Sequence, residues 1–132
     1  MKYLLDTDHC IAVLNRDARI KPTLESHAAT AIRLSTVSLA ELRYGIAKSA
    51  KQEESQARLR HLLGKITPVP FDDDAAIRYG DLRALLEKRG ASIGPLDTLI
   101  AAHALSLGWT LVTHNTREFK RVPGLVVEDW LT

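Results

Sequence analysis

Cysteine is nearly absent from this chain, which has Cys10 as its only example in 132 residues. One cysteine cannot form an intrachain disulfide, and such sparing use agrees with a reducing compartment. The neighbouring His9 does not supply the separated ligand pairs of a zinc site, so we expect no zinc. Cys10 is therefore predicted to pack as a small apolar group.

Long hydrophobic runs and aromatic residues are also scarce. No apolar stretch approaches the roughly 18 residues of a spanning helix, and no signal-peptide pattern precedes the first predicted strand, so we expect a cytoplasmic protein without a membrane partner. Aromatic residues make up only 5% of the sequence. That share argues against extensive base stacking, so a nucleic-acid partner would more plausibly be a folded RNA read by its shape.

The remaining composition is typical of a globular protein. Hydrophobic residues make up 45% and charged residues 26% of the chain, which excludes disordered and collagen-like classes. The length predicts one domain over residues 1–132, without a linker or an internal repeat. A net charge of +2 and a pI near 8.8 permit a polyanionic partner without requiring one.

Strands and helices are predicted to alternate along the chain. Apolar runs predict strands at residues 3–5, 31–36, 65–71, 110–113 and 125–127. Helical patterns cover residues 10–15, 21–28, 38–49 and 52–63. Two further helices are predicted, one opened by residues 72–74 that stops at Gly90 and one that starts at Pro95 and ends at Gly108. Helices 38–49 and 52–63 should form a long hairpin, and prolines within 65–71 suit an edge strand. The alternation favours the α/β class, with a mostly parallel sheet covered by helices on both faces.

Four polar residues are predicted to meet at one edge of this sheet. Asp6 and Asn115 directly follow the two clearest strands. Glu41 and Asp97 lie in the first turns of the helices predicted from residues 38 and 95. Ligands of open parallel sheets collect outside the carboxyl ends of the strands. Carboxylates gathered there would suit a hard divalent cation, and a cation beside a basic surface points to phosphodiester hydrolysis.

Three of these residues also have a purely structural explanation. Residues 38–41 match a capping box, in which Glu41 would only reach back to a backbone N–H. Asp97 would be favourable near a helix N-terminus through the helix dipole alone. Asn115 suits an ordinary turn. Their joint placement is what favours a functional site.

Asp6 is harder to explain by structure alone. Asp8 is the better candidate for the N-cap of the first helix, which leaves Asp6 without a capping role. A carboxylate that ends an apolar strand is costly to bury without a partner. Asp6 is therefore the strongest single indication of a site.

Other charged residues are placed outside the predicted site. His103 is expected to have a core or interhelical role, and His114 should point away from the side that Asn115 faces. Several basic residues are candidate phosphate contacts, although they could equally form a solvated helix face. They are Arg43, Lys48, Lys51, Arg58, Arg60, Lys65, Arg117, Lys120 and Arg121.

Four sequence blocks in order resemble those of PIN-domain ribonucleases. The likeness is closest to the VapC toxins of bacterial toxin–antitoxin pairs, and it covers essentially the whole chain. The blocks are Tyr-Leu-Leu-Asp-Thr-Asp at residues 3–8, Val-Ser-Leu-Ala-Glu-Leu at 37–42 with Gly45, residues 93–104 around Gly-Pro-Leu-Asp-Thr, and residues 112–119, followed by the ending at 122–130.

The resemblance implies a three-layer α/β/α fold and an RNA-cleaving activity that depends on magnesium or manganese. The family's acidic positions map onto Asp6, Glu41 and Asp97, while a fourth, often Asp, falls on Asn115 and puts a tightly held second metal in doubt. We assign Asp6 and Asp97 to the metal, Glu41 to the attacking water, and Asn115 to positioning water or metal. The products should carry 5′-phosphate and 3′-hydroxyl ends.

The resemblance also implies partners. It suggests transfer or ribosomal RNA as substrate, and an antitoxin whose basic tail fills the acidic pocket. It further suggests a homodimer formed through apolar helix faces. Two other interpretations remain open, namely a haloacid-dehalogenase-like phosphatase with Asp6 as nucleophile and an inert PIN-like module that binds a basic partner. A trapped aspartyl-phosphate would indicate the first, and the absence of metal-dependent cleavage would indicate the second.

Overall fold

The computed structural model describes all 132 residues and contains one parallel sheet. Its strands are β1 (Tyr3–Leu5), β2 (Ile32–Ser35), β3 (Thr67–Val69), β4 (Thr110–Val112) and β5 (Val127–Glu128). Their order is β3-β2-β1-β4-β5, and every neighbouring pair is parallel. The predicted α/β class is confirmed, and the proline-containing β3 lies at an edge of the sheet.

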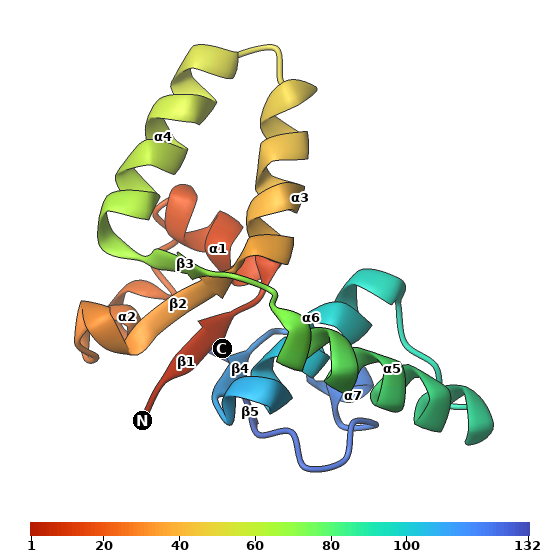
Figure 1. Ribbon diagram of the computed structural model, residues 1–132. Helices are drawn as coiled ribbons and strands as arrows, with labels where there is room; N and C mark the ends of the chain where they lie inside the picture. Colours follow the sequence, from red (N-terminus) through yellow and green to blue (C-terminus); the bar gives the residue numbers. More distant parts are fainter.

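Helices cover both faces of this sheet (Figure 1). They are α1 (Thr7–Leu14), α2 (Lys21–Glu25), α3 (Thr36–Ala47), α4 (Gln52–Lys65), α5 (Asp73–Lys88), α6 (Pro95–Leu107) and α7 (Thr116–Phe119), with a 3₁₀ turn at Ala29–Ala31. One hydrophobic cluster joins the sheet to α1, α3 and α4, and a second joins it to α5 and α6. The predicted three-layer arrangement is therefore confirmed.

Alternation of side chains in the central strand β1 supplies both clusters. Tyr3 and Leu5 belong to the cluster on the α1 side, and Leu4 belongs to the cluster on the α6 side. Leu4 and Leu5 are both 0% exposed, and burial of each such side chain contributes roughly 1.5–3 kcal/mol. Cys10 is also completely buried in the first cluster, as its apolar packing role predicts.

The α3–α4 hairpin is the most extended feature of the molecule, and it projects beyond the sheet in Figure 1. Leu59 and Leu62 face inward from α4 and anchor its base in the core. Close to the turn, the hydroxyl groups of Ser49 and Ser55 lie 3.3 Å apart. The predicted hairpin is thus confirmed.

Helix α6 begins and ends as the sequence predicts. Pro95 occupies its first turn, where its missing N–H is not needed. Gly108 ends the helix with a φ of 69°, a left-handed conformation that favours glycine. Because the start of α6 is fixed in this way, Asp97 is held in its first turn.

Several predicted boundaries are wrong. The first helix begins at Thr7 rather than residue 10, and Asp6 rather than Asp8 is its N-cap. The strand predicted at 65–71 is confined to Thr67–Val69, and the helix predicted at 21–28 ends at Glu25. The short α7 was not expected. None of the helices is both long and apolar enough to cross a membrane.

Candidate active site

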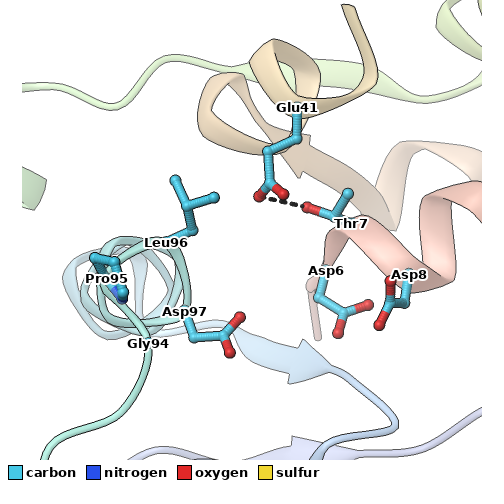
Figure 2. A pocket seen from close by; sticks show the side chains of 8 residues that line it. All are labelled: Asp6, Thr7, Asp8, Glu41, Gly94, Pro95, Leu96 and Asp97. Atoms are coloured by element: carbon cyan, nitrogen blue, oxygen red, sulfur yellow. Dashed lines mark hydrogen bonds between the residues drawn. The ribbon is translucent and has the colours of Figure 1, made fainter. Parts of the chain in front are cut away.

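A cavity of about 300 Å³ opens at the carboxyl end of β1, between the first turns of α1 and α6 and the flank of α3. Figure 2 shows its eight lining residues, with the carboxylate of Asp97 extending toward the β1–α1 junction. The lining residues are Asp6, Thr7, Asp8, Glu41, Gly94, Pro95, Leu96 and Asp97. Three of the four predicted site residues therefore share one cavity.

Asp6 is held by both its backbone and its side chain. Its N–H donates to the carbonyl of Val112 at 3.0 Å, which fixes the residue at the ends of β1 and β4. Its Oδ1 accepts the backbone N–H of His9 at 2.8 Å, which is the N-cap bond of α1. The residue is only 6% exposed. A capping role and a place in the cavity therefore belong to the same carboxylate.

Glu41 reaches the cavity from α3 and is fixed by Thr7. The hydroxyl of Thr7 donates to Glu41 Oε1 at 3.0 Å and lies 3.2 Å from the Ser38 hydroxyl. Helix α3 begins at Thr36 with Ser35 as its N-cap, so the predicted capping box at 38–41 is wrong. Glu41 lies beyond the first turn of α3, and its carboxylate turns toward Thr7 instead of a backbone N–H (Figure 2).

Asp97 is half-buried and lies close to other carboxylates, and both features raise its pKa. Its pKa is raised from 3.8 to about 6, with burial as the largest cause. The nearby carboxylate of Glu118 contributes next, through its charge and a shared hydrogen bond, and Asp6 and Glu41 add further negative potential. Three neighbouring carboxylates thus act on one half-buried carboxyl group.

Asn115 is placed differently from the other three predicted site residues. It does not line the cavity, and its side-chain N–H donates to Glu118 Oε2 at 2.8 Å. Its backbone N–H donates to the hydroxyl of Thr113 at 3.0 Å. Asn115 therefore orients the carboxylate of Glu118, which in turn acts on Asp97.

Glu118 is the member of the site that sequence reasoning missed. It lies in α7, whose formation was not predicted, three positions after Asn115. An amide and a carboxylate three residues apart on a helix can form a hydrogen bond, and that spacing was the available signal. A carboxylate is thus present three residues after position 115, and it raises the pKa of Asp97.

The oxygen-rich donor set fits a hard divalent cation. No three His, Cys, Asp or Glu side chains converge tightly enough to bind one ion together. Mg²⁺ retains several waters and needs only one or two direct carboxylates, so Asp6 and Asp97 can meet that requirement. The pKa of Asp97 is raised first by burial and then by the nearby carboxylates, and a bound cation would offset both by stabilising the ionised form.

The two discounted histidines have structural surroundings. His103 is completely buried, lies 2.9 Å from the Ser35 hydroxyl and meets the edge of Phe71. His114 pairs instead with Asp129 Oδ2 at 2.7 Å. Neither residue lines the cavity, and none of the candidate phosphate-contacting lysines and arginines does so either.

Comparison with known proteins gives full-length matches. The profile of the PIN domain matches residues 3–125. The chain is 41% identical over 132 residues to "Ribonuclease VapC2" of Rickettsia felis, covering 98% of each protein. It is 37% identical over 131 residues to "tRNA(fMet)-specific endonuclease VapC" of Salmonella typhimurium, again covering 98% of each.

Solved structures agree with these sequence matches. The crystal structure of VapBC2 from Rickettsia felis bound to a promoter DNA fragment contains a chain that superposes with a TM-score of 0.91 at 40% identity, covering 98% of this chain and 99% of that one. A chain of DNA-bound VapBC from Salmonella typhimurium superposes with a TM-score of 0.93 at 37% identity, covering 98% of both. The chain belongs to the PIN-domain family and, within it, to the VapC ribonucleases.

Proposed function

We propose that this ribonuclease is the toxin of a toxin–antitoxin pair and that it hydrolyses structured RNA with the help of Mg²⁺ or Mn²⁺. The observation that carries the metal requirement is the cavity that brings Asp6, Glu41 and Asp97 together, where burial and the neighbouring charges raise the pKa of Asp97. Like charges held together without compensation are unfavourable, and a divalent cation relieves that repulsion. The RNA substrate places the proposed reaction in the cytoplasm.

The chain's own groups divide the chemistry between them. Asp6 and Asp97 face the cavity from two elements and would bind the cation directly. A bound cation would lower the pKa of an attacking water and offset charge that grows on the phosphate. Glu41, fixed by the Thr7 hydroxyl, would orient that water and accept its proton. Asn115 and Glu118 would complete the outer part of the site by holding Asp97.

Hydrolysis by water makes a specific prediction about the products. The nucleophile is not the ribose 2′-hydroxyl, so the cleaved RNA should carry 5′-phosphate and 3′-hydroxyl ends. Transfer RNA is the favoured substrate class, since the Salmonella typhimurium relative is named for tRNA(fMet). Basic residues in and next to α3, α4 and α7 are the candidate contacts for the RNA backbone, because the acidic cavity cannot hold phosphates by itself.

An antitoxin is the proposed protein partner. The similar solved chains come from VapBC complexes that are bound to DNA. A basic tail from such a partner would compete with the cation for the same carboxylates and would thereby inhibit cleavage of RNA. We also propose a homodimer through apolar helix faces, for which Ile77 on α5, 59% exposed, is a candidate contact.

The test is to incubate the purified protein with total cellular RNA, with Mg²⁺ or with a chelator, and to map the new 5′ ends. Asp6→Asn and Asp97→Asn should abolish cleavage and retain the wild-type circular dichroism spectrum. The matched control is Asp81→Asn, which removes an exposed carboxylate on α5. This variant should cleave RNA at the wild-type rate. Full activity in a folded Asp97→Asn protein would remove the site assignment. Cyclic-phosphate ends would refute the hydrolytic route, and no cleavage by wild type would favour an inert PIN-like module.

A further inference from the structure

A buried histidine lies directly behind the proposed metal ligand Asp6. His9 is in the first turn of α1 and is 0% exposed, and it does not line the cavity. Its Nδ1 is 3.1 Å from Asp6 Oδ1. The same oxygen already accepts the backbone N–H of His9 at 2.8 Å. Backbone and ring of one residue therefore converge on one carboxylate oxygen.

The other ring nitrogen fixes the tautomer of His9. The backbone N–H of Trp130 points to His9 Nε2 at 3.2 Å. Asp129 Oδ1 lies farther from Nε2, at 3.5 Å. A backbone amide can only donate, so in the neutral ring Nε2 accepts from Trp130 and the hydrogen is on Nδ1. Nδ1 consequently donates to Asp6 Oδ1. Neither of these hydrogen bonds involves Asp6 Oδ2, which remains available to a ligand.

The Trp130 amide is itself held in place by independent contacts. The Trp130 side chain is 3% exposed and packs at 5.1 Å against both Tyr3 of β1 and His27. Asp129 Oδ1 accepts the N–H of Leu131 at 2.9 Å, which fixes the turn that carries the amide. The Trp130 amide therefore orients the His9 ring through Nε2, and the ring contacts Asp6 through Nδ1.

We propose that His9 is a positioning residue of the nuclease, whose Nδ1–H locks the Asp6 carboxylate so that Oδ2 is presented to the cation. This inference rests on the proposed metal-dependent function. The backbone N–H alone leaves the carboxylate free to turn about its terminal bond, whereas two donors on the same oxygen define its plane. Partners that orient a metal ligand in this way typically change metal affinity or activity by about 10–100-fold when removed.

Two substitutions separate the two nitrogens of the ring. The side-chain amide of asparagine reaches about as far as Nδ1, so His9→Asn keeps a donor for Asp6 but loses the acceptor for Trp130. Glutamine reaches about as far as Nε2, so His9→Gln keeps the acceptor for Trp130 but loses the donor for Asp6. Thermal unfolding reports the contact with Trp130, and binding of Mn²⁺ reports the contact with Asp6.

The experiment measures Mn²⁺ binding to the RNA-free protein by calorimetry, together with kcat, KM and the half-saturating Mn²⁺ concentration for cleavage of tRNA(fMet). His9→Gln should weaken Mn²⁺ binding by about 10–100-fold and leave KM for the RNA unchanged. His9→Asn should bind Mn²⁺ within about threefold of wild type while unfolding at a lower temperature. Wild-type Mn²⁺ binding in folded His9→Gln, or the reverse ranking of the two variants, would overturn the proposal.

A wild-type measurement covers the case in which a variant does not fold. In protein with ¹⁵N-labelled histidine, His9 should show a protonated Nδ1 and an unprotonated Nε2, and Mg²⁺ should shift its Nδ1 resonance. A hydrogen on Nε2, or no response to Mg²⁺ in protein that cleaves RNA, would exclude the positioning role. Asp6→Asn is run in parallel: if it cleaves like wild type, the proposed function fails whatever His9 does.

Discussion

Replacing Asp97 by asparagine should stabilise the cation-free protein at neutral pH. The folded-state pKa of Asp97, about 6, lies above its usual 3.8. A carboxyl group shifted in this direction contributes stability that is complete below about pH 3.8 and is lost as the pH rises through about 6. At pH 7.5 the ionised group therefore opposes folding, and an uncharged isostere removes that cost.

The magnitude follows from the size of the shift. About two pKa units correspond to roughly 3 kcal/mol at about 1.36 kcal/mol per unit. Asp97 is only half-buried, and solvent screening reduces this to about 1 kcal/mol. In a protein of this size such a change raises Tm by about 4 °C. At pH 4 the difference between Asp97→Asn and wild type should nearly vanish, since the folded-state carboxyl is then protonated.

Mg²⁺ should reverse the order of stability. A ligand at ten times its dissociation constant stabilises the folded state by about 1.4 kcal/mol. Wild type should gain that amount and Asp97→Asn almost none. The assay is urea unfolding in chelator and in Mg²⁺, at pH 7.5 and pH 4, with Asp81→Asn as the control for loss of one exposed charge. The reasoning is refuted if Asp97→Asn is less stable than wild type in chelator at pH 7.5, or if Asp81→Asn gives the same gain.

Further expectations concern the groups around the carboxylates. Thr7→Val removes the hydroxyl that fixes Glu41 and should lower kcat by about tenfold with little change in stability. An unchanged kcat would show that Thr7 does not orient Glu41 for the reaction. Glu118→Gln should lower the pKa of Asp97 because it removes the neighbouring charge that raises this pKa most. NMR titration in chelator would measure the shift. Asn115→Ala should reduce cleavage less than Glu118→Gln, since Asn115 acts only through Glu118; the opposite order in initial rates would contradict that chain of contacts. The half-saturating Mg²⁺ concentration should rise as the pH falls through about 6, where protons compete for Asp97, and a flat profile in cleavage assays from pH 8 to 5.5 would exclude this competition.

Strand ends were the most predictable part of the site. Asp6 follows an apolar strand, and Asp97 follows a glycine–proline pair that starts a helix, so local sequence fixes both positions along the chain. The parallel sheet then brings them to one edge. Their convergence could be predicted because it depends on topology and not on details of packing.

Choices between nearby polar residues could not be predicted. Asp6 and Asp8 are both acceptable helix caps, and in the fold Asp6, whose N–H also bonds to the Val112 carbonyl, is the residue that caps α1. Helix α3 was predicted to begin at residue 38, whereas Ser35, the last residue of β2, is its N-cap. In each case local cap preferences do not distinguish between polar residues two or three positions apart.

Contacts between distant segments could not be predicted from the sequence either. The His9–Trp130 bond joins residues from the two ends of the chain. Glu118 acts on Asp97 only because the brief helix α7 turns it back toward α6. Short helices carry a weak periodic signal, so this carboxylate could not be assigned to the site before the fold was known.

The strand order has a consequence for synthesis of the protein. Tyr3 at the start of β1 pairs with Thr110 of β4, so more than 100 residues must be synthesised before the first strand gains its second neighbour. Until Val112 has been added, the backbone N–H of Asp6 lacks the carbonyl group that fixes it in the folded protein, and translation proceeds at roughly 5–20 residues per second. A fragment that ends before β4 would consequently lack the strand that pairs with β1 and positions Asp6.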